Sequence, residues 1–299
     1  MKRRQWITIA AALILVVVIY KFGRTVPEKK TGAQAQSEAA DNTVIPTDSI
    51  LQQARKKLSP EQEARLNAIE HSVVRGDVKV QQLKVYHQLA HFWADSAQVF
   101  EPYAWYEAEA ARLENSEKSL TFAAHLFLQN LRGENDPDLR LWKAVQAKDL
   151  FERSLKINPD NDSSAVGLGA CYIFGNISAT PMEGIMKVLA VAERDSTNVF
   201  AQEVLGNGAM MSGQYAKAIS RFETVYRLSK TNLNVKLEAC LLLAEAFEKT
   251  GSNSSAIAWY EKSLELIKNE QIRDEVKKRI DDLSKQARQR KPDGQSEKN

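Results

Sequence analysis

Apolar residues recur at intervals of three and four positions through most of the chain, which predicts amphipathic helices. The stretch SGQYAKAISRFETVYRLSKTN, residues 212–232, is typical. Its alanine, Ala218, comes one helical turn before a much larger residue, Phe222. A helix with this order lets a neighbouring helix approach closely at one level and fills a gap at the next. The pattern therefore indicates tightly packed helix pairs rather than isolated helices.

The same order of residues recurs further along the chain. A turn glycine, an alanine and an aromatic residue stand at matching positions in two units, namely Gly213, Ala218 and Phe222, then Gly251, Ala256 and Tyr260. The two alanines are 38 residues apart. Upstream, Ala147 and Phe151 keep part of the pattern. Self-similarity at a period of this length is typical of a solenoid of stacked helix pairs.

The composition favours a helical chain, and the charge argues against one class of partner, nucleic acid. Glycine (13 residues) and proline (8 residues) are scarce, which favours helices over turns and strands. The net charge is only +3 and the charges are interspersed, so we expect no nucleic-acid partner. Cys171 and Cys240 both lie in helical patterns, where we expect buried free thiols.

These motifs resemble the tetratricopeptide repeat, a family of antiparallel helix pairs with small residues and an aromatic residue at fixed positions. The resemblance implies an all-α, right-handed superhelical solenoid of about five repeats. It is strongest at residues 199–230 and 237–268; Pro159 alone supplies the family's closing proline, and Gly184 replaces an alanine. The expected domains are an N-terminal helix at 51–79, the repeat array at 80–270, a capping helix at 271–288 and a disordered tail at 289–299. Helix starts are expected at Ser59-Pro60, Asp136-Pro137 and Thr180-Pro181.

The N-terminus carries the pattern of a membrane segment. Residues 6–22 are almost wholly apolar, follow three basic residues and would span about 25 Å as a helix. We therefore expect a membrane anchor at 1–23, followed by a disordered linker at 24–50. A cleaved signal peptide is the alternative, although no small-residue cleavage site follows closely. The basic cluster favours a cytoplasmic N-terminus, which would place the body in the periplasm if the source is bacterial.

The resemblance also implies a binding surface on the concave face, lined by the first helix of each repeat. Three groups of residues are expected there. The basic end would hold Lys84, His87 and His91; the apolar middle Leu120, Phe127, Val166, Ile173, Phe200 and Met210, with Glu203 and Asn207; and the acidic end Glu238, Leu241, Glu245 and Glu248. The apolar members could equally pack against neighbouring helices.

The chain offers little reactive chemistry. His87 and His91 are four residues apart and could share a metal, but no third ligand lies on their stripe, so we expect neither a metal nor a cofactor. We expect no enzyme, no small-molecule substrate, and a membrane-tethered scaffold of the cell envelope that binds a protein or peptide. The alternatives are an accessory subunit of an envelope enzyme or assembly system, for example in cytochrome maturation, or an unrecognised hydrolase.

Overall fold

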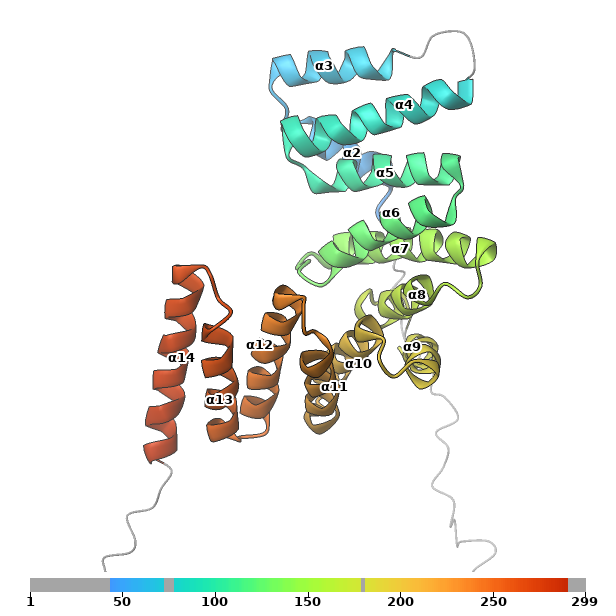
Figure 1. The fold of residues 1–299 in the computed structure, drawn as a ribbon. Coiled ribbons are helices and arrows are strands. Elements are labelled where there is room, and N and C mark those ends of the chain that lie inside the picture. Colours follow the sequence, from blue (N-terminus) through green and yellow to red (C-terminus); the bar gives the residue numbers. More distant parts are fainter. Residues whose placement is uncertain (1–43, 73–77, 179–180, 290–299) are drawn as a thin grey trace, which may run out of the picture. The chain divides into compact units, whose positions relative to one another are not determined.

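The computed structural model describes residues 44–72, 78–178 and 181–289, and in these residues the regular structure is entirely helical (Figure 1). There are thirteen α-helices and one π-helix in the described part: α2 (Thr47–Arg55), α3 (Pro60–Glu70), α4 (Val78–His91), η1 (Phe92–Ala97), α5 (Phe100–Glu114), α6 (Glu117–Leu131), α7 (Pro137–Ile157), α8 (Asp162–Phe174), α9 (Met182–Arg194), α10 (Val199–Met211), α11 (Tyr215–Leu228), α12 (Leu233–Lys249), α13 (Asn253–Leu264) and α14 (Glu270–Gln289). The segment expected to cross a membrane, residues 6–22, lies outside the described residues. Among the described helices, none has the length and apolar character that a membrane crossing requires.

Consecutive helices pack in antiparallel pairs. The pairs are α4 with α5, α6 with α7, α8 with α9, α10 with α11, and α12 with α13. The second helix of each pair also packs against the first helix of the next, and α14 packs against α13. The described residues thus confirm an all-α repeat solenoid.

The order of small and large residues has the role predicted for it. Ala218 and Phe222 of α11 are fully buried. A Cβ atom added to Gly206 of α10 would lie 2.5 Å from Cε1 of Phe222, so the phenylalanine ring fills the space that this glycine leaves. In the same way, a Cβ atom on Gly167 of α8 would lie 2.2 Å from Cζ of Phe151. Burial removes the apolar surface of each ring from water, which contributes roughly 1.5–3 kcal/mol to the free energy of unfolding.

Two of the three expected helix starts are confirmed. Ser59 forms a capping box with Gln62, and the Asp136 carboxylate accepts hydrogen bonds from two backbone N–H groups of α7. The third differs, because Pro181 precedes α9 as its N-cap and makes no side-chain cap. Thr180, the expected capping residue there, lies outside the described residues.

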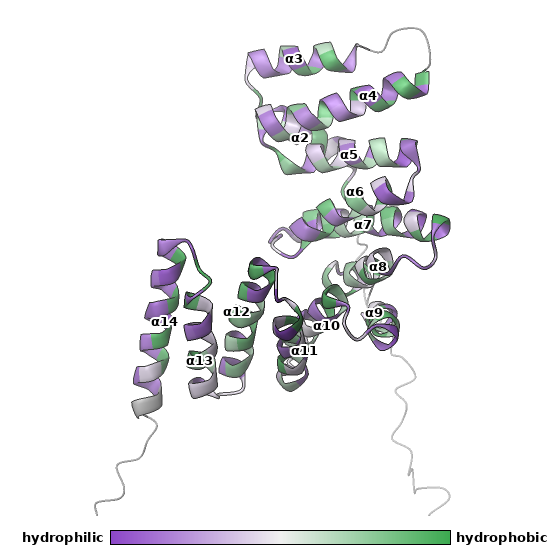
Figure 2. Cartoon of the chain, viewed as in Figure 1, coloured by the Kyte–Doolittle hydropathy of each residue, from purple (hydrophilic) through white to green (hydrophobic). Residues whose placement is uncertain are grey.

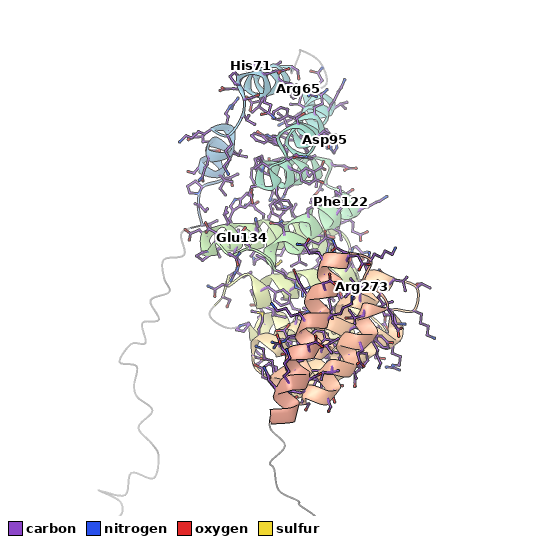
Figure 3. All side chains as sticks on the ribbon, turned by 90° about the vertical axis from the view of Figure 1, so that its left-hand side faces the viewer. Arg65, His71, Asp95, Phe122, Glu134 and Arg273 are labelled. Carbon is purple, nitrogen blue, oxygen red and sulfur yellow. The ribbon has the colours of Figure 1, made fainter. Side chains whose placement is uncertain are left out.

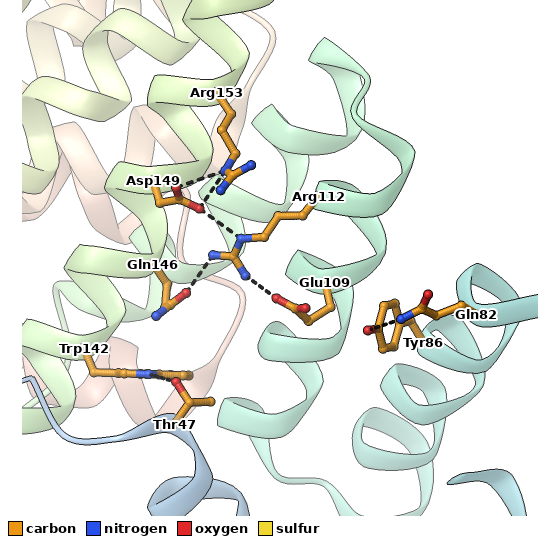
Figure 4. Close-up of polar contacts among 9 residues, drawn as sticks. All are labelled: Thr47, Gln82, Tyr86, Glu109, Arg112, Trp142, Gln146, Asp149 and Arg153. Atoms are coloured by element: carbon orange, nitrogen blue, oxygen red, sulfur yellow. Dashed lines mark hydrogen bonds and ion pairs between the residues drawn. The ribbon is translucent and has the colours of Figure 1, made fainter. Parts of the chain in front are cut away.

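The N-terminal region differs from the single helix expected at 51–79. Two helices, α2 and α3, occupy it, and α2 begins at Thr47, inside the expected linker. α2 packs against α5 through buried Ile50, and the Thr47 hydroxyl accepts a hydrogen bond of 3.0 Å from the indole N–H of Trp142 (Figure 4). The sequence carries the boundary between the two helices, because the Ser59-Pro60 helix start lies inside the range expected for one helix. Polar residues predominate on α3 (Figure 2).

The end of α4 also departs from a regular α-helix. Phe92 and Trp93 open the π-helix η1, and both are buried, with ring centroids 5.4 Å apart. Gln98 ends this turn in the left-handed conformation, with φ of 54°. The wider turn lets two adjacent aromatic residues enter the same core.

A polar network joins the first two pairs (Figure 4). Arg112 of α5 donates hydrogen bonds to Glu109 on its own helix and to Asp149 and Gln146 on α7, at 2.7–2.9 Å. Its guanidinium also lies 5.2 Å from the ring centroid of Trp105. Arg112 therefore fixes the position of α5 on α7.

Candidate binding groove

Two adjoining cavities, of about 340 and 610 Å³, form one groove along α10 and α12. Leu242 and Glu245 of α12 line both cavities. The other lining residues come from α12 and from six further helices or their ends: Leu131 and Arg132 from α6, Arg140 from α7, Phe174 from α8, Asn207, Met210 and Met211 from α10, Glu238, Leu241, Glu248 and Lys249 from α12, Tyr260 from α13, and Arg279 from α14. We call this set of residues the α10–α12 groove.

The middle of the α10–α12 groove is apolar. Phe174, Met210 and Leu242 are partly exposed there, and the adjacent Met211 side chain is 67% exposed. Methionine side chains are flexible and polarisable, which suits a surface that adapts to different partners. An exposed methionine beside a partly apolar cavity indicates a contact surface rather than core.

Arg132 connects the end of α6 to the far wall of the groove. Its guanidinium donates a 2.7 Å hydrogen bond to Oδ1 of Asn207 and lies 3.4 Å from Oε1 of Glu238. It also lies 5.8 Å from the ring centroid of Phe174. This arginine holds α6, α10 and α12 together across the groove.

Glu203, on the preceding turn of α10, has an unusual acidity. Its pKa is raised to about 7, first because the side chain is buried and second because the charge of Glu238 lies nearby, while Arg132 acts in the opposite direction. Its backbone carbonyl accepts a 2.8 Å hydrogen bond from Nδ2 of Asn207. The carboxyl group of Glu203, beside the groove, therefore changes its charge near neutral pH.

The acidic end is less negative than the sequence predicts. Glu248 accepts a 2.7 Å hydrogen bond from the Tyr260 hydroxyl and forms an ion pair with Arg279 of α14. Burial raises the pKa of Glu248, but these two donors outweigh it and hold the pKa below its usual value. Glu245, by contrast, is exposed at the centre of the groove.

Six of the expected residues line the groove: Asn207, Met210, Glu238, Leu241, Glu245 and Glu248. Glu203 does not line either cavity, but its backbone carbonyl accepts a hydrogen bond from Asn207. The expectation that Leu120, Phe127 and Val166 are available to a partner is wrong, since all three are fully buried. The first helices α6 and α8 pack directly against each other, so these side chains form the core between them. Ile173 is 9% exposed and lines a separate cavity between α8 and α11.

The remaining expected residues lie outside the α10–α12 groove. Phe200 is partly buried against the core, with its ring centroid 5.4 Å from that of His125. Lys84, His87 and His91 are exposed on α4. His87 lies 3.7 Å from a carboxylate oxygen of Glu107, and His91 lies 3.5 Å from one of Asp95. The two histidines thus face different carboxylates, and no group of three potential metal ligands exists among the described residues.

Sequence reasoning missed Arg132, Phe174 and Arg279. Arg132 and Arg279 lie on a helix end and on the capping helix, outside the positions that the repeat pattern assigns to a groove. Phe174 ends α8 one residue after an expected position, and Leu242 follows Leu241 on α12. Counting both members of each apolar doublet would have found Phe174 and Leu242.

Comparison with known proteins supports the repeat assignment at the C-terminal end. A tetratricopeptide repeat family model matches residues 237–270, which hold most of α12 and all of α13. No curated protein matches the chain. Residues 237–270 therefore have the sequence pattern of a tetratricopeptide repeat.

Three solved structures are similar to parts of this chain. MamA has 13% identity, a TM-score of 0.41, and coverage of 62% of this chain and 92% of its own. PilW, described as a widely conserved type IV pilus biogenesis factor, has 13% identity, a TM-score of 0.44, and coverage of 72% and 91%. YrrB, described as a TPR protein with an unusual peptide-binding site, has 15% identity, a TM-score of 0.41, and coverage of 73% and 99%. The described residues form an all-α solenoid, of which residues 237–270 match the tetratricopeptide repeat family model.

Proposed function

We propose that this protein is a protein-interaction scaffold whose α10–α12 groove binds a segment of a partner protein. The observation that carries the proposal is the exposed Met211 beside the apolar lining of Phe174, Met210 and Leu242. An apolar side chain of the partner inserted there would supply most of the affinity, because a few well-buried contacts dominate interfaces.

The charges of the groove set the orientation of the segment. Glu245 lies next to the apolar lining and would pair with a basic residue of the partner. The Arg140 guanidinium donates a hydrogen bond to the backbone carbonyl of Glu134, and it places a positive charge at the other wall of the groove. Reversing one exposed charge, as in Glu245→Lys, should slow association mainly at low salt.

Site-specific photo-crosslinking in the producing cell tests this function. A photoreactive residue at position 211 should form a discrete crosslinked product. The same residue at position 186 is the matched control, since Met186 on α9 is 58% exposed but lies outside the groove. Equal crosslinking at the two positions, or none at 211, would show that the groove is not the working surface.

We propose further that the scaffold is tethered to a membrane through residues 6–22, with the body in the periplasm. The support is the sequence pattern of a basic cluster followed by an apolar run. An accessory subunit of an envelope enzyme would use the same groove and the same tether. A reporter that is active only in the cytoplasm, fused after residue 50, should be inactive; activity there would contradict the orientation.

A further inference from the structure

A cavity of about 450 Å³ lies apart from the α10–α12 groove and shares no lining residue with it. Its walls are the turn at Ser196, the side chain of Gln202 on α10, and one face of α11. Lys217 and Arg221, four residues apart on that face, both line it, and Arg227 lies further along the helix. The volume is in the range of small-ligand sites.

The charge of this cavity is unbalanced. Three cationic side chains line it and no carboxylate does. Within the part of the chain that the structure describes, no ion pair involves Lys217, Arg221 or Arg227, whereas Arg112 and Arg279 each pair with a carboxylate. Asp195, in the adjacent turn, lies outside the lining, and its carboxylate accepts hydrogen bonds from the backbone N–H and hydroxyl of Thr197. An uncompensated cluster of cations attracts anions.

Gln202 holds the central cation in place without neutralising it. Its side chain is 3% exposed, its Nε2 donates to the backbone carbonyl of Ser196 at 3.0 Å, and its Oε1 accepts from Nη1 of Arg221 at 2.8 Å. The backbone contact fixes which end of the amide faces the arginine. Arg221 uses one of its five N–H groups in this bond, and the planar guanidinium is oriented before any ligand arrives.

We propose that this cavity binds a phosphate group. A tetrahedral oxyanion needs donors from several directions, and Arg221, Arg227, Lys217 and the hydroxyl of Ser220 surround one space. Arginine pairs with phosphate through two parallel charge-assisted hydrogen bonds. The group is either soluble phosphate or the phosphate of a lipid headgroup, which share this chemistry.

Binding by the full-length chain in a non-ionic detergent tests the proposal. Inorganic phosphate represents the soluble source, and monomeric dihexanoyl phosphatidylglycerol represents the headgroup. Arg221→Gln should weaken binding about tenfold or more, because it removes a charge-assisted contact. Arg227→Gln, at an exposed position, is a second variant that should weaken binding without disturbing the fold. Lys230→Gln, which removes an equal charge just after α11 and outside the cavity, should change the dissociation constant less than about twofold.

Each outcome decides the proposal. Binding of inorganic phosphate with this variant pattern supports a soluble ligand, and binding of the phospholipid alone with the same pattern supports a headgroup. Three results would overturn it: neither probe binds, succinate binds as tightly as phosphate, or Arg221→Gln and Lys230→Gln weaken binding equally.

Discussion

The α10–α11 pair and the α6–α7 pair bury their interfaces in different ways. In α10–α11, the centre of the contact is apolar: Phe222 fills the space beside Gly206, and Ala218 lets the helices approach. One hydrogen bond, from Arg221 to Gln202, also joins the two helices. In α6–α7, the buried surface includes Lys143, which is 1% exposed and lies 3.0 Å from Glu101 and 2.5 Å from Glu134.

Hydroxyl groups add to the polar character of the α6–α7 pair. Thr121 of α6, Ser154 of α7 and Ser164 of α8 form a closed set of hydrogen bonds of 2.8–2.9 Å. Glu134 lies in the long turn between α6 and α7, on the other side of the ribbon from Phe122 in Figure 3. Its carboxylate accepts a hydrogen bond from the ammonium group of Lys143. The α6–α7 pair thus adds paired buried polar groups to its apolar core, and such groups tolerate the loss of a partner poorly.

Removal of the buried ammonium group should have the largest effect. Lys143→Met keeps the volume but leaves the carboxylates of Glu101 and Glu134 without their cation. We expect a loss of about 3 kcal/mol in the free energy of unfolding, measured by urea denaturation. Lys148→Met on the same helix is the matched control; it breaks a partly exposed pair with Glu152 and should cost about 1 kcal/mol or less. Similar losses in the two variants would show that the buried cluster is not a special feature of α6–α7.

A larger side chain in the apolar part of the α10–α11 interface should have the next largest effect on the free energy of unfolding. Ala218→Leu adds volume to a fully buried position on α11 and should cost roughly 1–3 kcal/mol. The same change at exposed Ala216, on the same helix, should be nearly neutral. Thermal midpoints that coincide would contradict the packing described for α10–α11.

Glu203 of α10, close to the charge of Arg132 at the end of α6, should make stability depend on pH. Its pKa is about 7 in the folded state against 4.5 for the unperturbed group, so the folded chain holds a proton that the unfolded chain releases. The free energy of unfolding should therefore fall as pH rises from about 4.5 to 7, and level off above that.

This pH effect should be the smallest of the three, at roughly 1–2 kcal/mol, since Glu203 keeps some contact with water. Urea denaturation at pH 5 and pH 8 measures it. Glu203→Gln should remove the contribution and leave a flatter profile. An unchanged profile in the variant would assign the pH dependence to other groups.

Regular repeats were predictable from the sequence because their packing is encoded locally. The positions of Gly213, Ala218 and Phe222 indicate a helix pair without reference to distant residues, and both turn glycines have the positive φ that such turns favour. The burial of Cys171 and Cys240 as free thiols was predicted for the same reason.

The groove was predicted only in part, because it depends on residues from distant repeats. Asn207 and Glu238 were expected from the resemblance to the tetratricopeptide repeat, but their partner Arg132 is 75 residues away from Asn207 along the chain. Leu120 and Phe127 were misplaced because an apolar residue on a first helix can face either a groove or the next helix. The sequence of one helix does not distinguish these environments; the contact between α6 and α8 does.

The role of the α10–α12 groove is tested most directly by measuring how tightly two matched variants bind the partner that crosslinks at position 211. Met211→Glu places a charge in the apolar part of the groove, and Met186→Glu makes the same change at a similarly exposed methionine elsewhere. We predict that the first raises the dissociation constant more than tenfold, about 1.4 kcal/mol, and that the second changes it less than about twofold, with unchanged helicity in both. Equal affinities for the two variants would contradict the claim that the α10–α12 groove binds the partner.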